Sequence, residues 1–323
     1  METTILGATG MRVSRICLGC MGYGTPDWRP WVLDENQARP FFKRAIEAGI
    51  NFFDTSNMYS VGVSEEVTGK LVREYGNLEE CVIATKVFFP MNDRPNMGGL
   101  SRKNLQQACE ASLRRLGVET IDLYQLHRLD PHTPMEETLR ALEDLIRAGK
   151  VRHVGASSMY AWELATALGI AERTGLPRLA TMQPHYNLIN REEEREMLPL
   201  CADMNVAVIP WSPMARGKLT RAWDETTNRT ESDEFGRHLY SMEESDRAVA
   251  EAVGAVAEGR GVSRAQVALA WVMRNPAVTS PIIGATKPHH LADAVAAVDL
   301  ELTDDEVAAV EAPYLPHPIV GFV

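Results

Sequence analysis

The feature that most constrains the fold is an alternation of short apolar runs with longer helical segments along the whole 323-residue chain. Several of the helical segments end in glycine, which favours the left-handed backbone of a helix C-cap. The helical segments include 35–49, 101–117, 134–150 and 191–204, and the first three have glycine near their ends, at positions 49, 117 and 149. The apolar runs have the length and composition of β-strands, and they occupy residues 15–21, 50–56, 81–87, 121–127, 151–157, 179–185, 206–212 and 280–286.

Strand and helix patterns that alternate in this way are typical of βαβ units, in which the strands are parallel. Eight such units in roughly 300 residues favour an α/β fold of the closed (β/α)8 TIM-barrel type. An open, doubly wound sheet is the alternative, but no G-x-G-x-x-G follows the first strand. Because no linker, repeat or low-complexity stretch divides the chain, we expect a single domain over residues 1–323.

Two segments interrupt the alternation. Residues 217–245, after the seventh strand, are polar and too long for an ordinary connection, so we expect a lid or ligand clamp at the rim of the barrel. Near the end of the chain, Thr303 and Glu306 have the spacing of a capping box. This spacing predicts an extra C-terminal helix, followed by a tail that prolines keep extended.

The charge balance bears on partners and location. With 44 acidic and 33 basic residues the formal net charge is −11, which disfavours nucleic acid and anionic membrane surfaces as partners. The first residues lack the features of a secretory signal, and no apolar run reaches the length of a membrane span. We therefore expect a cytoplasmic protein with a small-molecule substrate, and the sequence specifies no oligomeric state.

The five cysteines favour a reducing compartment over a disulfide framework. Cys17 and Cys20 form a C-x-x-C, but they lie on a predicted strand, where residues three apart point to opposite faces. No second Cys/His pair has metal-ligand spacing. We expect neither a metal nor a redox role for this pair.

Four ionisable residues of complementary kinds are predicted at one rim of the barrel. Asp54 ends the second strand, Tyr59 lies in the following loop, Lys86 is near the end of the third strand and His127 closes the fourth. Catalytic side chains of such barrels come from the carboxyl ends of the strands. Alone, the Asp is ordinarily a helix cap, the Tyr rim packing and the His a satisfied polar group. Lys86 is different because a buried ammonium within an apolar run requires a carboxylate, and Asp54 is the nearest candidate.

These residues lie in strings that resemble a known family. FFDTSNMYS, VIATKV and DLYQLHRLDPHTPMEETL resemble the Asp, Tyr, Lys and His segments of the aldo-keto reductases. The resemblance continues through VRHVGASS, TMQPHYNL, VIPWSPMARGKL and PIIGATKPHHL, nearly the whole chain in the family's order. Within the family, HYNLINREEEREMLPLC and PYLPHPIVGF resemble the bacterial YajO-like branch. The resemblance implies reduction of aldehydes or ketones to alcohols with NADPH, that is, NADP(H) as the cofactor.

The same resemblance implies a role for each of the four residues. Tyr59 is the general acid, and Lys86 makes its proton easier to donate because a nearby ammonium stabilises the phenolate. Asp54 keeps Lys86 charged, and His127 orients the substrate carbonyl. The hydride comes from the nicotinamide, which supplies chemistry that no side chain has.

The resemblance also carries over contacts to the cofactor. Ser157, Ser158 and Gln183 match the residues that hold the carboxamide, and Trp211 matches the aromatic residue, Tyr in many members, that stacks on the nicotinamide. The loop that covers the pyrophosphate is matched by Ser212, Met214, Arg216, Gly217 and Lys218.

The loop after the eighth strand matches the segment that binds the adenosine ribose phosphate. Its matching residues are Gly284, Thr286, Lys287, His290 and Asp293. Many members have Lys-Ser where this chain has Gly284 and Ala285, an Arg at position 290 and an adenine-facing Asn at position 294, which is Ala here. Thr286 and Lys287 remain as a hydroxyl and a cation for a 2′-phosphate.

Two alternative functions stay open. Lys86 could form a Schiff base with a sugar phosphate, and the YajO-like branch has been linked to deoxyxylulose phosphate formation; this chemistry needs a neutral lysine. The chain could also be an NADPH-binding sensor with slow turnover, resembling potassium-channel β-subunits.

Substrate contacts are also open at this point. Arg128 could meet an anionic substrate or simply pair with Asp130. The aromatic residues that could line the substrate site are Trp28, Trp31, Phe88, Phe89 and Tyr240.

Overall fold

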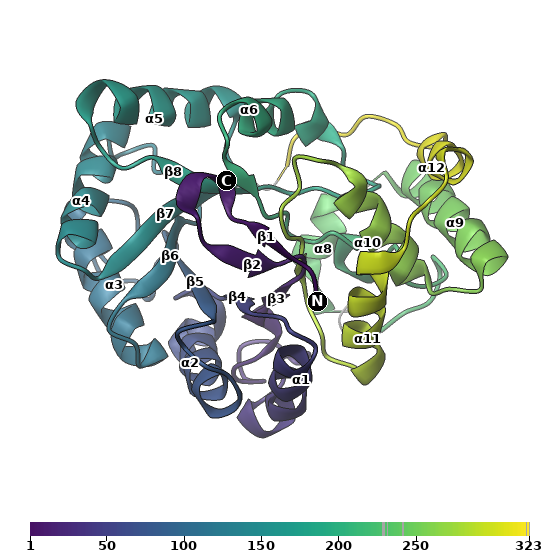
Figure 1. Cartoon of the computed structure of the whole chain (residues 1–323), viewed down its shortest axis with the longest axis horizontal. Helices are drawn as coiled ribbons and strands as arrows, with labels where there is room; N and C mark the ends of the chain where they lie inside the picture. Colours follow the sequence, from purple (N-terminus) through teal and green to yellow (C-terminus); the bar gives the residue numbers. More distant parts are fainter. Residues whose placement is uncertain (228–229, 231, 241, 321, 323) are drawn as a thin grey trace.

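A computed structural model describes residues 1–227, 230, 232–240, 242–320 and 322 (Figure 1). The strands are β1 (Thr3–Ile5), β2 (Arg12–Ser14), β3 (Cys17–Gly19), β4 (Phe52–Asp54), β5 (Val82–Val87), β6 (Ile121–Leu126), β7 (Val151–Ser157), β8 (Leu179–Gln183), β9 (Ala207–Val208) and β10 (Ile282–Ile283). The α-helices are α1 (Glu35–Glu47), α2 (Val63–Tyr75), α3 (Arg102–Leu116), α4 (Met135–Arg147), α5 (Ala161–Thr174), α6 (Met197–Asp203), α8 (Glu234–Leu239), α9 (Glu243–Arg260), α10 (Arg264–Arg274), α11 (Pro288–Ala296) and α12 (Asp304–Glu311). Short 3-10 helices are η1 (Gly7–Thr9), η2 (Cys20–Gly22), η3 (Tyr59–Gly62), η4 (Glu192–Glu194), η5 (Ala215–Gly217) and η6 (Ala297–Asp299).

Within the described residues, eight parallel strands form one sheet in the order β10-β3-β4-β5-β6-β7-β8-β9. The two ends of this order meet, because Val208, the last residue of β9, forms a parallel bridge with Val278 and the amide of Ile282 donates to the carbonyl of Pro210 at 2.9 Å. The helices surround the strands (Figure 1). The predicted (β/α)8 TIM barrel is confirmed, and each of its strands lies within one of the eight predicted runs.

The N-terminal hairpin of β1 and β2 is antiparallel and was not predicted. It crosses the centre of the strand ring in Figure 1, and its Leu6 and Val13 are fully buried in a cluster with the inward residues of the barrel strands. The hairpin therefore plugs the amino end of the barrel. The same cluster includes Cys17, whereas Cys20 is buried in the layer between sheet and helices. The two cysteines therefore lie in different clusters, but the prediction that both belong to one strand is wrong, since β3 ends at Gly19 and Cys20 begins η2.

One predicted helix is shorter than expected. The segment 191–204 was predicted as one helix, but its first part is η4 and the α-helix begins only at Met197. Pro199 favours this later start, because proline has no amide to donate and is best accommodated in the first turn of a helix, although α1 holds Pro40 in its interior.

The segment after β9 and the tail extend the barrel. The long polar stretch begins at the last residue of η5, contains α8 and leads into α9, whereas its residues 228, 229, 231 and 241 lie outside the described chain. The capping box of α12 is confirmed: Thr303 accepts from the amide of Glu306, whose carboxylate accepts from the amide of Thr303.

Candidate active site

The four predicted catalytic residues lie together at the carboxyl end of the barrel. Asp54 is the last residue of β4, Lys86 is the penultimate residue of β5, and His127 follows β6 directly. Tyr59 opens η3 in the loop after β4. Asp54, Lys86 and His127 are buried, whereas Tyr59 is half-buried, so it is the most accessible of the four side chains.

Lys86 has the carboxylate partner that the sequence required. Its ammonium lies 2.5 Å from Oδ2 of Asp54 and donates to the carbonyl of Thr55 at 2.9 Å. Its third neighbour is the hydroxyl of Tyr59, at 3.4 Å. Burial alone lowers the pKa of Lys86, but the charges and hydrogen bonds of Asp54 and Tyr59 outweigh burial and raise it. The ammonium therefore stays charged at neutral pH, within reach of the phenol.

Two buried amides hold the other oxygen of Asp54. Gln125 and Gln183 each donate to Oδ1, at 2.9 Å and 3.0 Å, and the Gln183 amide also donates to Gln125 at 3.2 Å. Sequence analysis missed Gln125, although a polar residue in the apolar run IDLYQLH is the same signal that identified Lys86. The two amides fix the carboxylate that faces Lys86, which makes the ion pair rigid.

His127 faces the phenol of Tyr59. The two rings meet edge to face with centroids 5.8 Å apart, and Nδ1 of His127 lies 3.1 Å from the hydroxyl of Ser56. Burial, followed by the positive charges of Lys86 and Arg128, holds the pKa of His127 well below its usual range. The imidazole is therefore neutral at physiological pH, and it can donate or accept a hydrogen bond without adding a charge.

The backbone after Tyr59 is strained. Ser60 and Val61 have φ of 48° and 51°, a left-handed conformation that a β-branched residue such as Val61 rarely adopts. Ser60 accepts from the amide of Thr25 at 3.2 Å, which ties the turn to the loop after β3. Strain of this kind persists where the surrounding structure imposes it, often at functional sites.

The residues predicted to hold the carboxamide also lie at the carboxyl end. Ser157 and Gln183 end the paired strands β7 and β8. The hydroxyl of Ser157 donates to the carbonyl of Gln183 at 2.9 Å, and Ser158 accepts from the indole nitrogen of Trp211 at 3.1 Å. Within the described residues, the side-chain oxygen of Gln183 has no hydrogen-bond partner, so it remains available as an acceptor.

The buried side chain of His185 packs against one face of the Trp211 indole. The ring of His185 stacks on the indole at 4.1 Å between centroids and 9° between planes, and it also lies 2.8 Å from the hydroxyl of Tyr240. Burial, followed by the charges of Arg216, His317 and Arg128, lowers the pKa of His185 to about 3. The sequence predicted neither His185 nor the contact of Tyr240 with it. This contact links Tyr240, in the long polar stretch, to the ring that stacks on Trp211.

The five residues predicted over the pyrophosphate fall on one turn. Ser212, Met214, Arg216, Gly217 and Lys218 follow β9 directly, within or beside η5. Arg216 already pairs with Asp233 at 2.5 Å, so an anion that binds Arg216 has to share or replace this carboxylate. The ammonium of Lys218 lies over the ring of Trp223, 4.0 Å from its centroid.

The residues predicted at the ribose phosphate lie between β10 and α11. Gly284 has open space around its backbone, and Lys287 is the exposed N-cap residue of α11. The amide of Thr286 donates to His290 at 3.3 Å, whereas Asp293 accepts from Gln266 at 3.0 Å. Thr286 and Lys287 thus lie side by side where a helix begins, a place that favours anions.

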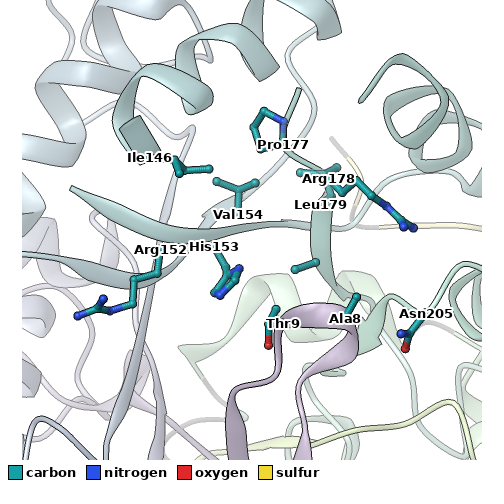
Figure 2. Close-up of a pocket in the computed structure, with 11 residues that line it drawn as sticks. Ala8, Thr9, Ile146, Arg152, His153, Val154, Pro177, Arg178, Leu179 and Asn205 are labelled. Atoms are coloured by element: carbon teal, nitrogen blue, oxygen red, sulfur yellow. The ribbon is translucent and has the colours of Figure 1, made fainter. Parts of the chain in front are cut away.

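A pocket of about 290 Å³ lies at the other end of the barrel (Figure 2). It is formed by η1, the starts of β7 and β8 and neighbouring loops, and it contains none of the predicted site residues.

The predicted catalytic residues are concentrated at the carboxyl end of the barrel, where a half-buried phenol, a charged lysine and a neutral imidazole meet. Such a group of residues can protonate an oxygen that gains negative charge.

Known proteins match the chain over nearly its whole length. Residues 15–314 match the Aldo/keto reductase family. The chain is 43% identical to versiconal hemiacetal acetate reductase of Aspergillus parasiticus, over 99% of this chain and 98% of that protein. It is 42% identical to a putative aryl-alcohol dehydrogenase of Schizosaccharomyces pombe (98% and 96% covered) and 37% identical to one of Saccharomyces cerevisiae (97% and 96% covered).

The described residues contain no helix long and apolar enough to cross a membrane. In that part of the chain there is also no group of three or more His, Cys, Asp or Glu residues that could hold a metal ion. All five cysteines are free and buried.

Proposed function

The chain belongs to the aldo/keto reductase family and is an NAD(P)H-dependent oxidoreductase, and from this premise we propose that it reduces aldehydes or ketones with NADPH, using Tyr59 as the proton donor. The observation that carries the proposal is the ammonium of Lys86, held between the carboxylate of Asp54 at 2.5 Å and the hydroxyl of Tyr59 at 3.4 Å. Carbonyl reduction needs a proton for the alkoxide as it forms, and this contact makes the phenol able to supply it.

The roles of the four residues follow from their surroundings. As the carbonyl oxygen gains negative charge, Tyr59 gives up its proton, and the positive charge of Lys86 stabilises the phenolate that is left. Asp54, fixed by Gln125 and Gln183, keeps Lys86 charged and in place. The neutral imidazole of His127 hydrogen-bonds the same substrate oxygen and orients it toward the phenol.

The residues at this end of the barrel fit a nicotinamide dinucleotide. The unused oxygen of Gln183 and the hydroxyl of Ser158 suit a carboxamide, and the half-buried indole of Trp211, supported by His185, suits a flat aromatic ring. The bound nicotinamide supplies the hydride. The preference for NADPH over NADH rests on Thr286 and Lys287 at the start of α11, where a hydroxyl and a cation can meet a 2′-phosphate.

Aromatic aldehydes are the substrate class that we propose. The rings nearest the reacting groups are Phe89, 4.9 Å from His127, and Trp28, 6.2 Å from Tyr59. Two of the relatives are named as putative aryl-alcohol dehydrogenases. These relatives are fungal, so the assignment to the bacterial YajO-like branch stays a prediction.

The test follows NADPH absorbance with p-nitrobenzaldehyde for the wild type and for Tyr59→Phe, with NADH in parallel. We expect turnover that prefers NADPH and depends on Tyr59. Tyr75→Phe, a change in α2 away from the site, is the matched control and should keep wild-type turnover. Equal turnover in Tyr59→Phe would remove the proposed proton donor.

The two alternatives predict different results. A sugar-phosphate enzyme needs a neutral Lys86, whereas Asp54 and Tyr59 raise the pKa of Lys86 and oppose Schiff-base formation. Borohydride trapping with a ketose phosphate would label Lys86 only if that chemistry operates. An NADPH sensor would bind the cofactor tightly and show negligible turnover across a panel of aldehydes.

A further inference from the structure

Arg128 is a buried guanidinium with few partners. It follows His127 after β6 and is only 7% exposed. Within the described residues its one hydrogen bond runs from Nη1 to the carbonyl of His127, at 2.6 Å. Its Nε is buried without a hydrogen-bond partner. Because Nε and Nη2 share one edge of the guanidinium, that edge is left with two unused donors.

The nearby carboxylate does not neutralise Arg128. Asp130 accepts from the amides of Leu100 and His132 and from the hydroxyl of Thr133, at 2.7, 2.9 and 2.8 Å. Pairing of Arg128 with Asp130, one of the two roles that the sequence left open, is therefore not what the structure shows. Burial lowers the pKa of Arg128 to about 10, so the side chain is still charged at neutral pH.

The guanidinium lies beside the reacting groups. Its carbon is 5.5 Å from the centroid of Phe89, whose ring is 4.9 Å from that of His127. The positive charge of Arg128 lowers the pKa of both His127 and His185, and a negative charge on Tyr59 raises the pKa of Arg128 in turn. Arg128 is thus close to both the proton donor and the ring behind Trp211.

Unlike Arg128, the other two arginines near the site lie against a carboxylate. Arg216 and Arg29 both lie against Asp233, at 2.5 Å and 3.9 Å. An isolated buried cation costs several kcal/mol unless an anion joins it. Arg128 therefore has the charge, the burial and the unused donors of a residue that binds an anion from solution.

We propose that Arg128 determines substrate specificity by binding a carboxylate on the carbonyl substrate, so that the preferred substrates are aromatic aldehydes or ketones that carry a carboxylate. This inference rests on the proposed function, since it assigns a substrate class to the same site. A charged guanidinium donates strongly to a carboxylate, and Nη2 is the donor that a ligand reaches first, since Nε becomes accessible only when the side chain shifts.

The experiment compares 4-carboxybenzaldehyde with its methyl ester, which has the same reacting group and no charge. The measured quantity is the ratio of kcat/KM for the acid to kcat/KM for the ester. We expect Arg128→Gln to lower this ratio by roughly 10- to 100-fold through the acid alone, because a hydrogen bond to a charged group is lost. Arg128→Lys should recover part of the ratio, since it keeps the charge but not the fork.

The matched control is Arg152→Gln, which removes the same charge from an exposed site at the start of β7, beside the pocket at the other end of the barrel. Its acid-to-ester ratio should equal that of the wild type. A ratio that is unchanged in Arg128→Gln, or that falls equally in Arg152→Gln, would overturn the inference.

Inhibition tests the same contact without relying on turnover of the acid. Benzoate should inhibit reduction of p-nitrobenzaldehyde by the wild type far better than the neutral analogue benzamide, and the difference should vanish in Arg128→Gln. If Arg128→Gln does not fold, equal inhibition by benzoate and benzamide in the wild type still refutes the inference. If the wild type reduces no aldehyde, the proposed function fails, and thermal stabilisation by benzoate over benzamide then decides on Arg128 separately.

Discussion

Replacing Lys86 by Met leaves a buried carboxylate without its cation. Asp54 and Lys86 are 3% and 0% exposed, and Lys86 is the hydrogen-bond partner of Oδ2 of Asp54. Gln125 and Gln183 still hold Oδ1, but two neutral amides do not balance a full charge. Removing one partner of a buried ion pair costs about 3–5 kcal/mol. For a chain of 323 residues, an unfolding entropy of about 2.1 cal/mol/K per residue converts this cost to a fall in Tm of about 4–7 °C.

The assay is urea unfolding at pH 7.5, followed by circular dichroism, with thermal unfolding in parallel. The double variant Asp54→Asn/Lys86→Met should recover most of the loss, because it removes the unbalanced charge and keeps an amide between the two glutamines. Lys70→Met is the control: Lys70 is exposed and pairs with Glu35 at the surface, so we expect a change below about 1 kcal/mol. The reasoning is refuted if Lys86→Met unfolds within about 1 kcal/mol of the wild type, or if the double variant is no more stable than the single one.

Four further outcomes can be measured. Tyr59→Phe should lower kcat by about 10²- to 10⁴-fold, while fluorescence titration shows unchanged NADPH binding. Trp211→Ala should weaken NADPH binding by about tenfold in the same titration, and Trp211→Phe should weaken it less. Burial lowers the pKa of His127, so below about pH 6.5 this histidine is protonated in the unfolded chain but not in the folded one. The free energy of unfolding should therefore fall as pH drops from 7 to 5, and it should fall less steeply in His127→Gln. Burial, and then the charge of Glu192, raises the pKa of Glu193 to about 8, so a stability penalty grows as pH rises from 4.5 to 8, and Glu193→Gln should raise Tm at pH 8 but not at pH 4.

The barrel was predictable because most residues of its strands are buried on both faces, so the strands are mainly apolar in sequence. The hairpin of β1 and β2 escaped prediction for the opposite reason: each strand has three residues, and the exposed Thr3 and Ile5 flank a half-buried Thr4, which leaves no apolar run. The late start of α6 at Met197 could have been predicted from the sequence, since Pro199 favours a position in the first turn of a helix.

The four candidate catalytic residues were predictable because parallel strands bring their carboxyl ends to one rim. The neighbouring residues that hold the site in place were harder to predict. Gln125 gave a signal, a polar residue inside an apolar run, whereas the stacking of His185 on Trp211 depends on tertiary packing that spacing does not encode. The pairing of Arg216 with Asp233 joins residues 17 positions apart, a separation that no helical or strand periodicity singles out.

The plugged amino end of the barrel has a practical consequence. Arg15, just after the hairpin, donates to the carbonyls of Met273, Val278 and Thr279, so the first residues are anchored to the turn before β10. Met1 lies against Gly49, at the start of the second barrel strand and away from the reacting rim. A tag or surface linker attached there would hold the molecule with its reacting face turned to solution. Libraries that diversify the loops after Gly19, Val87 and Val208 could then alter selectivity while the anchored end keeps the fold.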